Sequence, residues 1–424
     1  MSDVATVPPP AAEEQPPDTE HLSFGKRLWY AYLYGSTPVL VVLAFVLALV
    51  IGAILIAVSD EPTRNAMGYF TQHPSDTFSR GWHAIASAYS QLFEGSIFNP
   101  NSLYSNSGVA ILNPISDTLT NATPLILTGL AVGLAFRAGL FNIGGQGQII
   151  AGAICAGYVG FAWSLPPGLH VIVAVLAGAI GGAVWGGIAG LLKAATGAHE
   201  VITTIMLNYV AFYLLSYLLG LGGFQKPNSN EAISRTVHSS ALLPHLLGSN
   251  QKLRVNVGLL IAIAAAVVCW WLLTRSTLGF RLRAVGANHL AARTAGMSVA
   301  NSYLVVMLIA GALAGLAGAT QVMGVNTSLN QSIDAGIGFD AITVALLGFA
   351  SPGGIVAAGL LFGAFRAGSV QLLVNTTTPQ EIVDVIQAVI VLFIAAPGLI
   401  RTIFRLRAAR AGRGAGQLAK GWNG

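Results

Sequence analysis

The chain has 424 residues, of which 54% are apolar and only 9% are charged, whereas a soluble domain carries about 25% charged side chains. This composition excludes a water-soluble enzyme, a disordered protein and chemistry that depends on many titratable groups. The mean hydropathy is +0.69, and apolar runs near 20 residues recur along the chain. Runs of that length predict an all-α polytopic membrane protein, because the strands of a membrane β-barrel alternate over about 10 residues.

The first segment, residues 1–25, is rich in Pro and acidic residues and has almost nothing to bury. We predict a disordered cytoplasmic tail there. A cleaved signal peptide would begin with basic residues and a short apolar core. Here the first basic pair is Lys26-Arg27, and the run Pro38–Val58 is long enough to span a membrane. We therefore expect it to remain as the first helix of a transmembrane domain over 26–404.

Ten apolar segments are predicted to be membrane helices, at 38–58, 115–137, 144–163, 169–192, 200–221, 255–274, 301–323, 340–350, 353–372 and 382–400. The eighth is too short to cross about 30 Å, because its residues rise only about 16 Å. We expect a broken or re-entrant helix there, ending at Ser351-Pro352-Gly353-Gly354. Counting it as a crossing gives about ten helices and leaves both termini on one side. A nine-helix alternative would leave the basic C-terminus outside.

The distribution of charge predicts the orientation. With both termini cytoplasmic, 14 of the 21 Lys and Arg residues lie inside, six lie outside, and Arg366 lies within a span. Most acidic residues fall in the outside segments, so the positive-inside rule is satisfied. The net charge of +5 is thus an orientation signal, and no nucleic-acid partner is expected.

Three segments outside the spans have distinct compositions. Residues 59–114 and 222–254 are predicted extracytoplasmic loops, which either face a substrate-delivery protein or are plain surface loops. The aromatic and polar stretch Phe78–Phe93 is typical of a helix that lies in the membrane interface. Residues 405–424 are a predicted basic cytoplasmic tail, attracted to anionic membrane lipid rather than to RNA.

The sequence lacks the motifs of the common catalytic sites. No HExxH, GxSxG or Walker A pattern is present, so the chain is not expected to be an enzyme, to bind a metal or cofactor, or to hydrolyse ATP. Cys155 and Cys269 lie in apolar runs and are interpreted as small buried hydrophobic residues. The Gly pairs 181–182 and 186–187 have the spacing of a helix-contact face.

Among the few ionisable residues within the predicted spans are Asp340, Arg366 and Asp384. Each is costly in a membrane unless it is paired or faces water. An ion pair between Arg366 and one of the two aspartates, holding a broken helix in place, is the preferred interpretation. Contact with the substrate is the alternative.

The segment Gly139–Gln148 joins two spans without a charge and with few β-branched residues. An irregular backbone survives at membrane depth only if it is buried in protein or lines a wet cavity. Asn142, Gln146 and Gln148 would satisfy the freed backbone groups and line a translocation path, or the segment is an ordinary tight cytoplasmic hairpin. Thr203 and Asn208 of the fifth span are further path candidates, since amide and hydroxyl groups suit a neutral polyhydroxylated solute.

The predicted cytoplasmic loop 275–300 is the longest inside segment between spans. Asn288 is a good N-cap and Gly296 is a good C-terminal stop, so a two-turn helix of mostly small residues is predicted between them. An isolated helix of that length is unstable in water, so a partner must pack on it.

Part of this loop resembles a motif of a known protein family. Leu290-Ala291-Ala292-Arg293-Thr294-Ala295-Gly296 resembles the coupling helix of ABC importer permeases, and Leu282–Gly286 resembles its lead-in. Gly139–Gln148 and Glu200–Tyr209 are similar to the branched-chain amino acid, ribose and nucleoside permease family, closest to its nucleoside and simple-sugar branch. The resemblance implies contact with an ATPase through Gly286, Asn288, Leu290, Ala291, Ala292, Arg293 and Gly296. Leu290 replaces the usual acidic residue, and His289 replaces a frequent Pro.

The resemblance further implies the function and the partners. The chain would be a multi-pass permease subunit of an ATP-driven nucleoside importer in the bacterial plasma (inner) membrane. It would pair with a second permease subunit, cytoplasmic subunits that bind ATP, and an external substrate-binding lipoprotein. A simple-sugar (ribose-type) importer is the nearest alternative. An ion-coupled secondary transporter is disfavoured because few acidic residues lie in the spans, and a scaffold or channel would not need a coupling helix.

Overall fold

A computed structural model describes residues 37–105, 108–248, 253–376 and 378–405. Within these ranges the chain is helical and forms no β-strand, only the isolated bridges Gln225–Ser234 and His245–Asn256. The tails predicted over 1–25 and 405–424 lie outside the described residues, except for Arg405.

Each of the ten predicted segments is helical in the structure. Nine are single helices: α2 Thr37–Ser59, α5 Gly108–Arg137, α6 Gly145–Ala162, α7 Leu169–Thr196, α8 Glu200–Leu219, α9 Gly258–Arg275, α12 Val299–Gly324, α13 Ile337–Leu347 and α14 Pro352–Asn375. The tenth is divided into α15 Glu381–Ala395 and α16 Pro397–Ile403, with a bend of 91° at the break. Pro397 at the start of α16 lacks the N–H that would continue α15.

Among the described residues, seven helices are long and apolar enough to cross a membrane, and α15 with α16 would make an eighth. The remaining two predicted spans are α6, which has 18 residues, and α13, which has 11. The fold class of an all-α polytopic membrane protein is therefore confirmed. That α6 and α13 complete ten helices across the bilayer stays a prediction.

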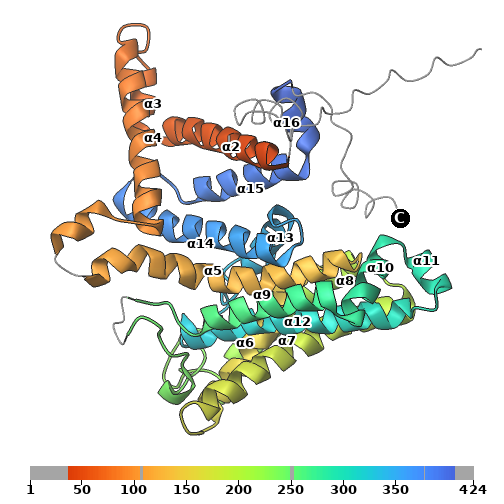
Figure 1. The fold of residues 1–424 in the computed structure, drawn as a ribbon. Coiled ribbons are helices and arrows are strands. Elements are labelled where there is room, and N and C mark those ends of the chain that lie inside the picture. The colour runs from red at the N-terminus through yellow and green to blue at the C-terminus, as the bar shows by residue number, and fades with distance from the viewer. Residues whose placement is uncertain (1–36, 106–107, 249–252, 377, 406–424) are drawn as a thin grey trace, which may run out of the picture.

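The centre of the molecule is a set of closely packed helices. In Figure 1, α5, α12, α14 and α7 run in nearly the same direction, and the main hydrophobic core lies between α5, α12 and α14. α12 meets α7 where a Cβ at Gly182 would collide with the carbonyl oxygen of Gly311. The predicted glycine contact face is confirmed, because only small residues allow two helices to approach so closely.

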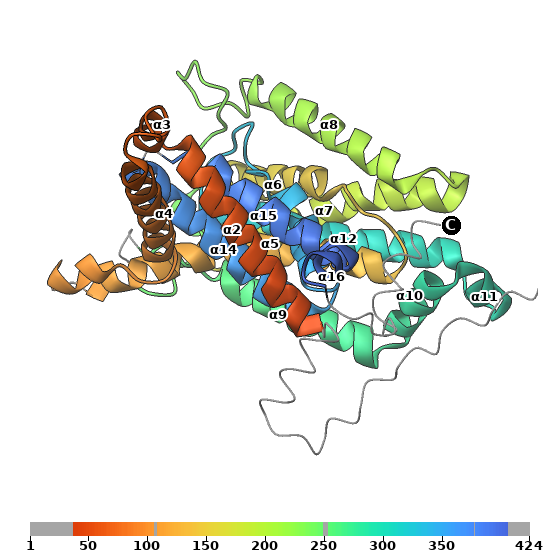
Figure 2. The same cartoon turned by 90° about the horizontal axis from the view of Figure 1, so that it is seen from above.

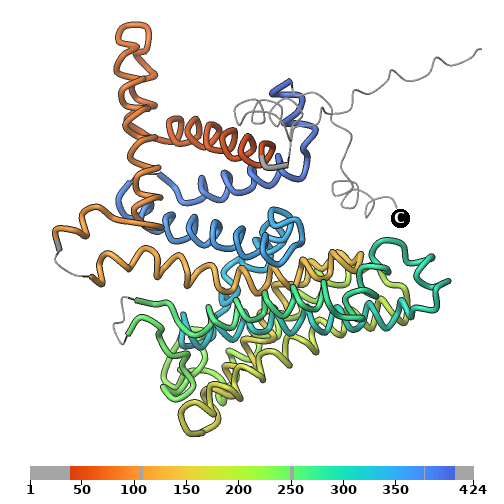
Figure 3. The backbone as a smooth tube through the Cα atoms, in the orientation of Figure 1, coloured from red at the N-terminus to blue at the C-terminus, as the bar shows by residue number. Residues whose placement is uncertain are grey.

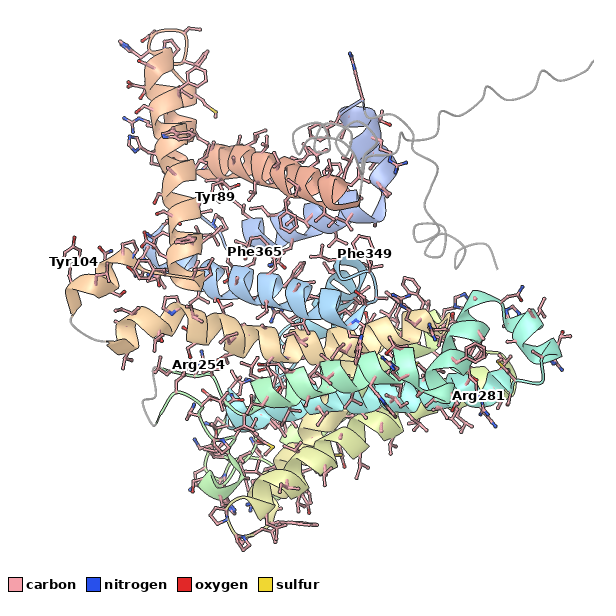
Figure 4. All side chains as sticks on the ribbon, viewed as in Figure 1. Tyr89, Tyr104, Arg254, Arg281, Phe349 and Phe365 are labelled. Carbon is pink, nitrogen blue, oxygen red and sulfur yellow. The ribbon has the colours of Figure 1, made fainter. Side chains whose placement is uncertain are left out.

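The predicted loop 59–114 is mostly helical. It contains α3 Glu61–Met67, α4 Pro74–Ser96 and the 3₁₀ turn η1 Pro100–Ser105, and α5 begins at Gly108 rather than near residue 115. α4 covers the predicted interfacial stretch and lies across the direction of α2 and α14 (Figures 1 and 3). Tyr89 lies between α4 and α2, where its hydroxyl donates to the carbonyl of Leu49 (Figure 4).

The segment after α8 covers the ends of α6, α7 and α12 with little helix, only η2 Ser239–Ala241. The N–H of Leu243 donates to the carbonyl of Met323 over 3.0 Å. His170 is fully buried and lies 2.8 Å from Ser240 Oγ and 3.0 Å from the carbonyl oxygen of Val159. These bonds hold the segment against the helix ends.

At the opposite end of the bundle, α10 Thr277–Ala287 and α11 His289–Thr294 project beyond the long helices (Figures 1 and 2).

Candidate functional site

The first part of the site is the break between α5 and α6. The chain turns at Gly139, whose φ is +76°, and α6 starts at Gly145. Asn142 accepts a hydrogen bond from the N–H of Gly144 over 2.9 Å, and its side-chain amide pairs with that of Gln148 at 3.3 Å. Both amides are about 1% exposed. Asn142 thus satisfies a backbone N–H at the break, and Gln148 holds the Asn142 side chain in place.

Asn208 of α8 fastens this break from a neighbouring helix. Its side-chain oxygen accepts from the N–H of Gly147 over 2.8 Å, and its amide nitrogen donates to the carbonyl of Ile143 over 2.9 Å. Three predicted path residues, Asn142, Gln148 and Asn208, are thus brought together as buried groups that support the turn. Thr203 is not part of this network, since its hydroxyl donates to the carbonyl of His199, the residue before α8. Thr204, which the sequence did not single out, packs against Gly144 instead.

The second part of the site is the start of the short helix α13. Gly336 adopts a φ of +74° and precedes Ile337, the first residue of α13. Gly338 packs against the backbone of Gln146, so closely that a Cβ at residue 338 would collide with it. The N-termini of α6 and α13 therefore meet, which brings together the positive ends of two helix dipoles.

Asp334 lies at this meeting point and was not identified from the sequence. It is 5% exposed, it accepts from the N–H of Gly336 over 3.3 Å, and its carboxylate bonds with the side chain of Gln146. A carboxylate beside two helix N-termini is in a favourable field. In the sequence, Asp334 directly precedes Ala335-Gly336 and a short apolar helix. It could have been predicted from that position.

Arg366 of α14 anchors the same end of α13. Its Nη2 atom lies 2.8 Å from a carboxylate oxygen of Asp340 and 2.6 Å from the carbonyl oxygen of Ala335. Asp384, in the first turn of α15, makes no ion pair with Arg366 in the part of the chain that the structure describes. Of the two aspartates considered from the sequence, Asp340 is the partner.

The other end of α13 is held by a second arginine. α13 is followed by Phe349 and Ala350, which have φ values of 52° and 47°. Arg137, the last residue of α5, donates to the carbonyl of Ala350 over 2.9 Å and to that of Phe349 over 3.2 Å. Figure 4 labels Phe349 at this end of the short helix. α13 is thus fixed at both ends by arginines from two different long helices.

Residues 275–300, the predicted coupling loop, contain the predicted capped helix. The side chain of Asn288 accepts from the N–H groups of Leu290 and Ala291, both over 3.0 Å, and Gly296 has a φ of +81°. Ala292 is buried against the chain itself. The outward face of α11 carries Leu290, Ala291, Arg293 and Thr294, all exposed.

The coupling loop touches the α5–α6 break directly. Gly286, near the end of α10, packs so closely on this turn that a Cβ there would collide with the carbonyl oxygen of Arg137 and lie 2.9 Å from the N atom of Gly139. This contact joins α10 to the turn that Asn142 and Asn208 support. At the same end of the bundle, Lys193 and Glu200 form an ion pair of 2.7 Å that joins α7 to α8.

Comparison with known proteins identifies the family. Residues 115–395 match the family described as the branched-chain amino acid transport system permease component. The chain belongs to this family. The permease is therefore a multi-pass membrane component of a transport system.

Curated relatives extend over most of the permease. It is 38% identical to the guanosine ABC transporter permease protein NupP of Bacillus subtilis over 324 residues, which cover 76% of this chain and 88% of NupP. It is 36% identical to the nucleoside ABC transporter permease protein NupB of Lactococcus lactis, with 70% and 83% covered. It is 38% identical to the glucose ABC transporter permease protein TsgB13 of Haloferax volcanii, with 66% and 75% covered. No solved structure matches significantly.

Proposed function

We propose that this permease forms the translocation path of an ATP-driven importer for a nucleoside. The structural observation that carries the mechanism is the close contact of Gly286 with Arg137 and Gly139. This contact joins the loop that carries α11 to the α5–α6 break, and the contact of Gln146 with Gly338 joins the break to the start of α13. A partner ATPase that binds α11 would shift both breaks together. The similarity to permeases named for guanosine and for nucleosides supports the choice of substrate.

The proposed partners follow from this mechanism. The exposed face of α11, a helix of 6 residues, would bind a cytoplasmic ATP-binding subunit. A second permease subunit would complete the path, and an external binding lipoprotein would deliver the solute. We place the end that carries α11 in the cytoplasm. The start of α2 and the end of α16 lie toward that same side in Figures 1 and 2, which supports placing these two helix ends on the cytoplasmic side as well.

Import of a simple sugar is the second candidate, favoured by the similarity to the glucose permease of Haloferax volcanii. A stand-alone transporter driven by an ion gradient fits less well. Asp340 is already neutralised by Arg366, and a carboxylate with a fixed cation is a poor site for a transported proton or sodium ion.

Uptake by whole cells separates these candidates. Bacteria with and without the gene are given labelled guanosine or uridine, each with and without excess unlabelled ribose. Gene-dependent nucleoside uptake that ribose does not reduce is the expected result. Gene-dependent uptake of ribose alone would replace the nucleoside proposal with sugar import, and the permease assignment would stand.

A further inference from the structure

α8 exposes a column of tyrosines. Tyr209, Tyr213 and Tyr217 follow one another at every fourth position and so share one face of the helix. They are 57%, 65% and 66% exposed. The opposite face of α8 holds the buried residues Thr204, Asn208, Ala211, Leu215 and Leu219. The tyrosine column is therefore an outward surface of the chain, not part of its core.

The outward surfaces of two other long helices have a different composition. The exposed large residues of α2 are Val42, Val46, Leu49, Val50, Ile54 and Val58, and those of α7 are Leu169, Ile172, Leu176, Ile180, Val184, Ile188, Leu191 and Leu192. Both sets are entirely aliphatic, as expected of surfaces in contact with lipid chains. α8 also exposes Ile202, Met206, Val210 and Leu214. It differs from α2 and α7 in that three tyrosines interrupt this aliphatic surface, although α8 is also long and apolar enough to span.

Interfacial anchoring does not account for the column. Tyrosines are common at the ends of membrane helices, and Tyr217 is close to such an end. The 20 residues of α8 rise about 30 Å, so Tyr209 lies near the middle of the bilayer and Tyr213 about one turn beyond it. A phenol hydroxyl without a partner is costly in hydrocarbon. None of the three hydroxyls forms a hydrogen bond within the described part of the chain. This face is therefore suited to contacts other than lipid.

α8 also borders both helix breaks. Asn208, next to Tyr209 in the chain, fastens the turn before α6. Ser216, next to Tyr217, accepts a hydrogen bond over 3.4 Å from Gln331 in the segment that leads into α13. α8 is thus joined to both breaks, and the column lies on its outward face, where the proposed second permease subunit would complete the path.

We propose that Tyr209, Tyr213 and Tyr217 form a stacking surface along the translocation path, on which the base of the transported nucleoside lies. Aromatic rings bind the flat face of any base, and their hydroxyl groups bond with polar edges as the solute moves past. Three rings at one-turn intervals offer successive contacts of similar strength. The inference rests on the proposed nucleoside import and names the surface that recognises the base.

Uptake by substituted permeases, expressed with the partner subunits, tests the stacking. Tyr209→Leu and Tyr213→Leu are expected to lower guanosine uptake about tenfold, a loss typical of one base–aromatic contact. Tyr209→Phe and Tyr213→Phe keep the ring and are expected to retain at least half of it. Tyr158→Leu is the matched control, because Tyr158 is similarly exposed on α6 but lies outside the column. Guanosine uptake should fall more than uridine uptake, since a purine has the larger face.

Two uptake results would overturn the inference. Leu variants that transport like the native permease would remove the stacking role. Leu variants that no longer copurify with the other subunits, but transport normally per assembled complex, would make the column a subunit contact. If the native permease imports no nucleoside at all, the proposed function fails first, and this is seen before any variant is made.

Thiol labelling gives a second measurement that does not depend on transport. A membrane-impermeant thiol reagent is applied to Tyr213→Cys and to Ile180→Cys on the aliphatic face of α7, with the native chain as the blank for Cys155 and Cys269. Labelling of Tyr213→Cys alone, reduced by guanosine but not by ribose, is expected. Equal labelling of the two variants, or no protection by guanosine, contradicts the proposal.

Discussion

Arg366 of α14 and Asp340 of α13 form an ion pair of 2.8 Å across 26 positions of sequence. The same guanidinium also donates a hydrogen bond to the carbonyl oxygen of Ala335, just before α13 begins. α13 has only 11 residues, too few to cross the membrane as a single helix. Its place between α5 and α14 depends on this arginine at one end and on Arg137 at the other.

Removing the Arg366 side-chain charge should release the start of α13. Arg366→Met leaves Asp340 without its partner, and both side chains are less than one third exposed. Such a loss costs roughly 1–3 kcal/mol, less than for a fully buried pair. We expect a lower temperature of unfolding in detergent and little uptake. Arg366→Lys keeps the charge but lacks the planar group that bonds with both Asp340 and Ala335. Its unfolding temperature and its uptake should be intermediate. Unchanged uptake by Arg366→Met would show that α13 needs no such anchor.

Enlarging Gly286 should uncouple the ATPase from the path. The Cβ of Gly286→Ala would collide with the carbonyl oxygen of Arg137, so α10 must move away from the α5–α6 turn. We expect uptake to fall at least tenfold while ATP hydrolysis by the assembled complex continues. Gly353→Ala is the control, because no heavy atom lies within 4 Å of the added methyl group. Equal uptake by both variants would exclude transmission through Gly286.

The cap of α11 can be weakened without enlarging any side chain. Asn288→Ala removes the acceptor of two backbone N–H groups, which costs about 1 kcal/mol of helix stability. Faster hydrogen exchange over residues 289–297 and a several-fold loss of uptake are expected. Asn288→Asp retains the acceptor and should restore both. A variant that exchanges faster but transports normally would indicate that the ATPase does not need a preformed helix.

Much of this architecture follows from the sequence, because an apolar run in lipid must satisfy its backbone as a helix. The broken eighth helix was also predictable, from its length and from Ser351-Pro352-Gly353-Gly354. The sequence could not show which of Asp340 and Asp384 pairs with Arg366, since this depends on how α13, α14 and α15 are oriented relative to one another. Nor could it show the contact between Gly286 and Arg137, because sequence patterns describe one helix at a time. The bend at Ala396 was missed although Pro397 marks it.

Asn208 should matter for the integrity of the α5–α6 break. Asn208→Leu leaves the N–H of Gly147 and the carbonyl of Ile143 without their partners, and each unsatisfied buried group costs about 1–3 kcal/mol. Thermal unfolding in detergent is expected at a clearly lower temperature than for Val210→Leu, a conservative change on the exposed side of the same helix. Equal unfolding temperatures would mean that the break is stable without this clamp.

α4 is expected to lie in the outer interface of the membrane. One side of it packs on the bundle through Thr77, Gly81, Ala88, Leu92 and Ser96, and Phe78 and Trp82 are about 70% exposed on a neighbouring side. Aromatic side chains at the headgroup level favour that position. A chain in which Trp82 is the sole tryptophan should be quenched strongly by lipids brominated near the headgroup. Quenching only by lipids brominated at the chain ends, or by none, would contradict the placement.

The central claim is that this permease moves a nucleoside when a partner hydrolyses ATP. The assembled importer is reconstituted in proteoliposomes with ATP and Mg²⁺ inside and with its binding protein and labelled guanosine outside. Accumulation above the external concentration that needs hydrolysable ATP and is lost in Gly286→Ala is the predicted result. Accumulation driven by a proton or sodium gradient without ATP, or no accumulation of guanosine under any condition, would contradict the account.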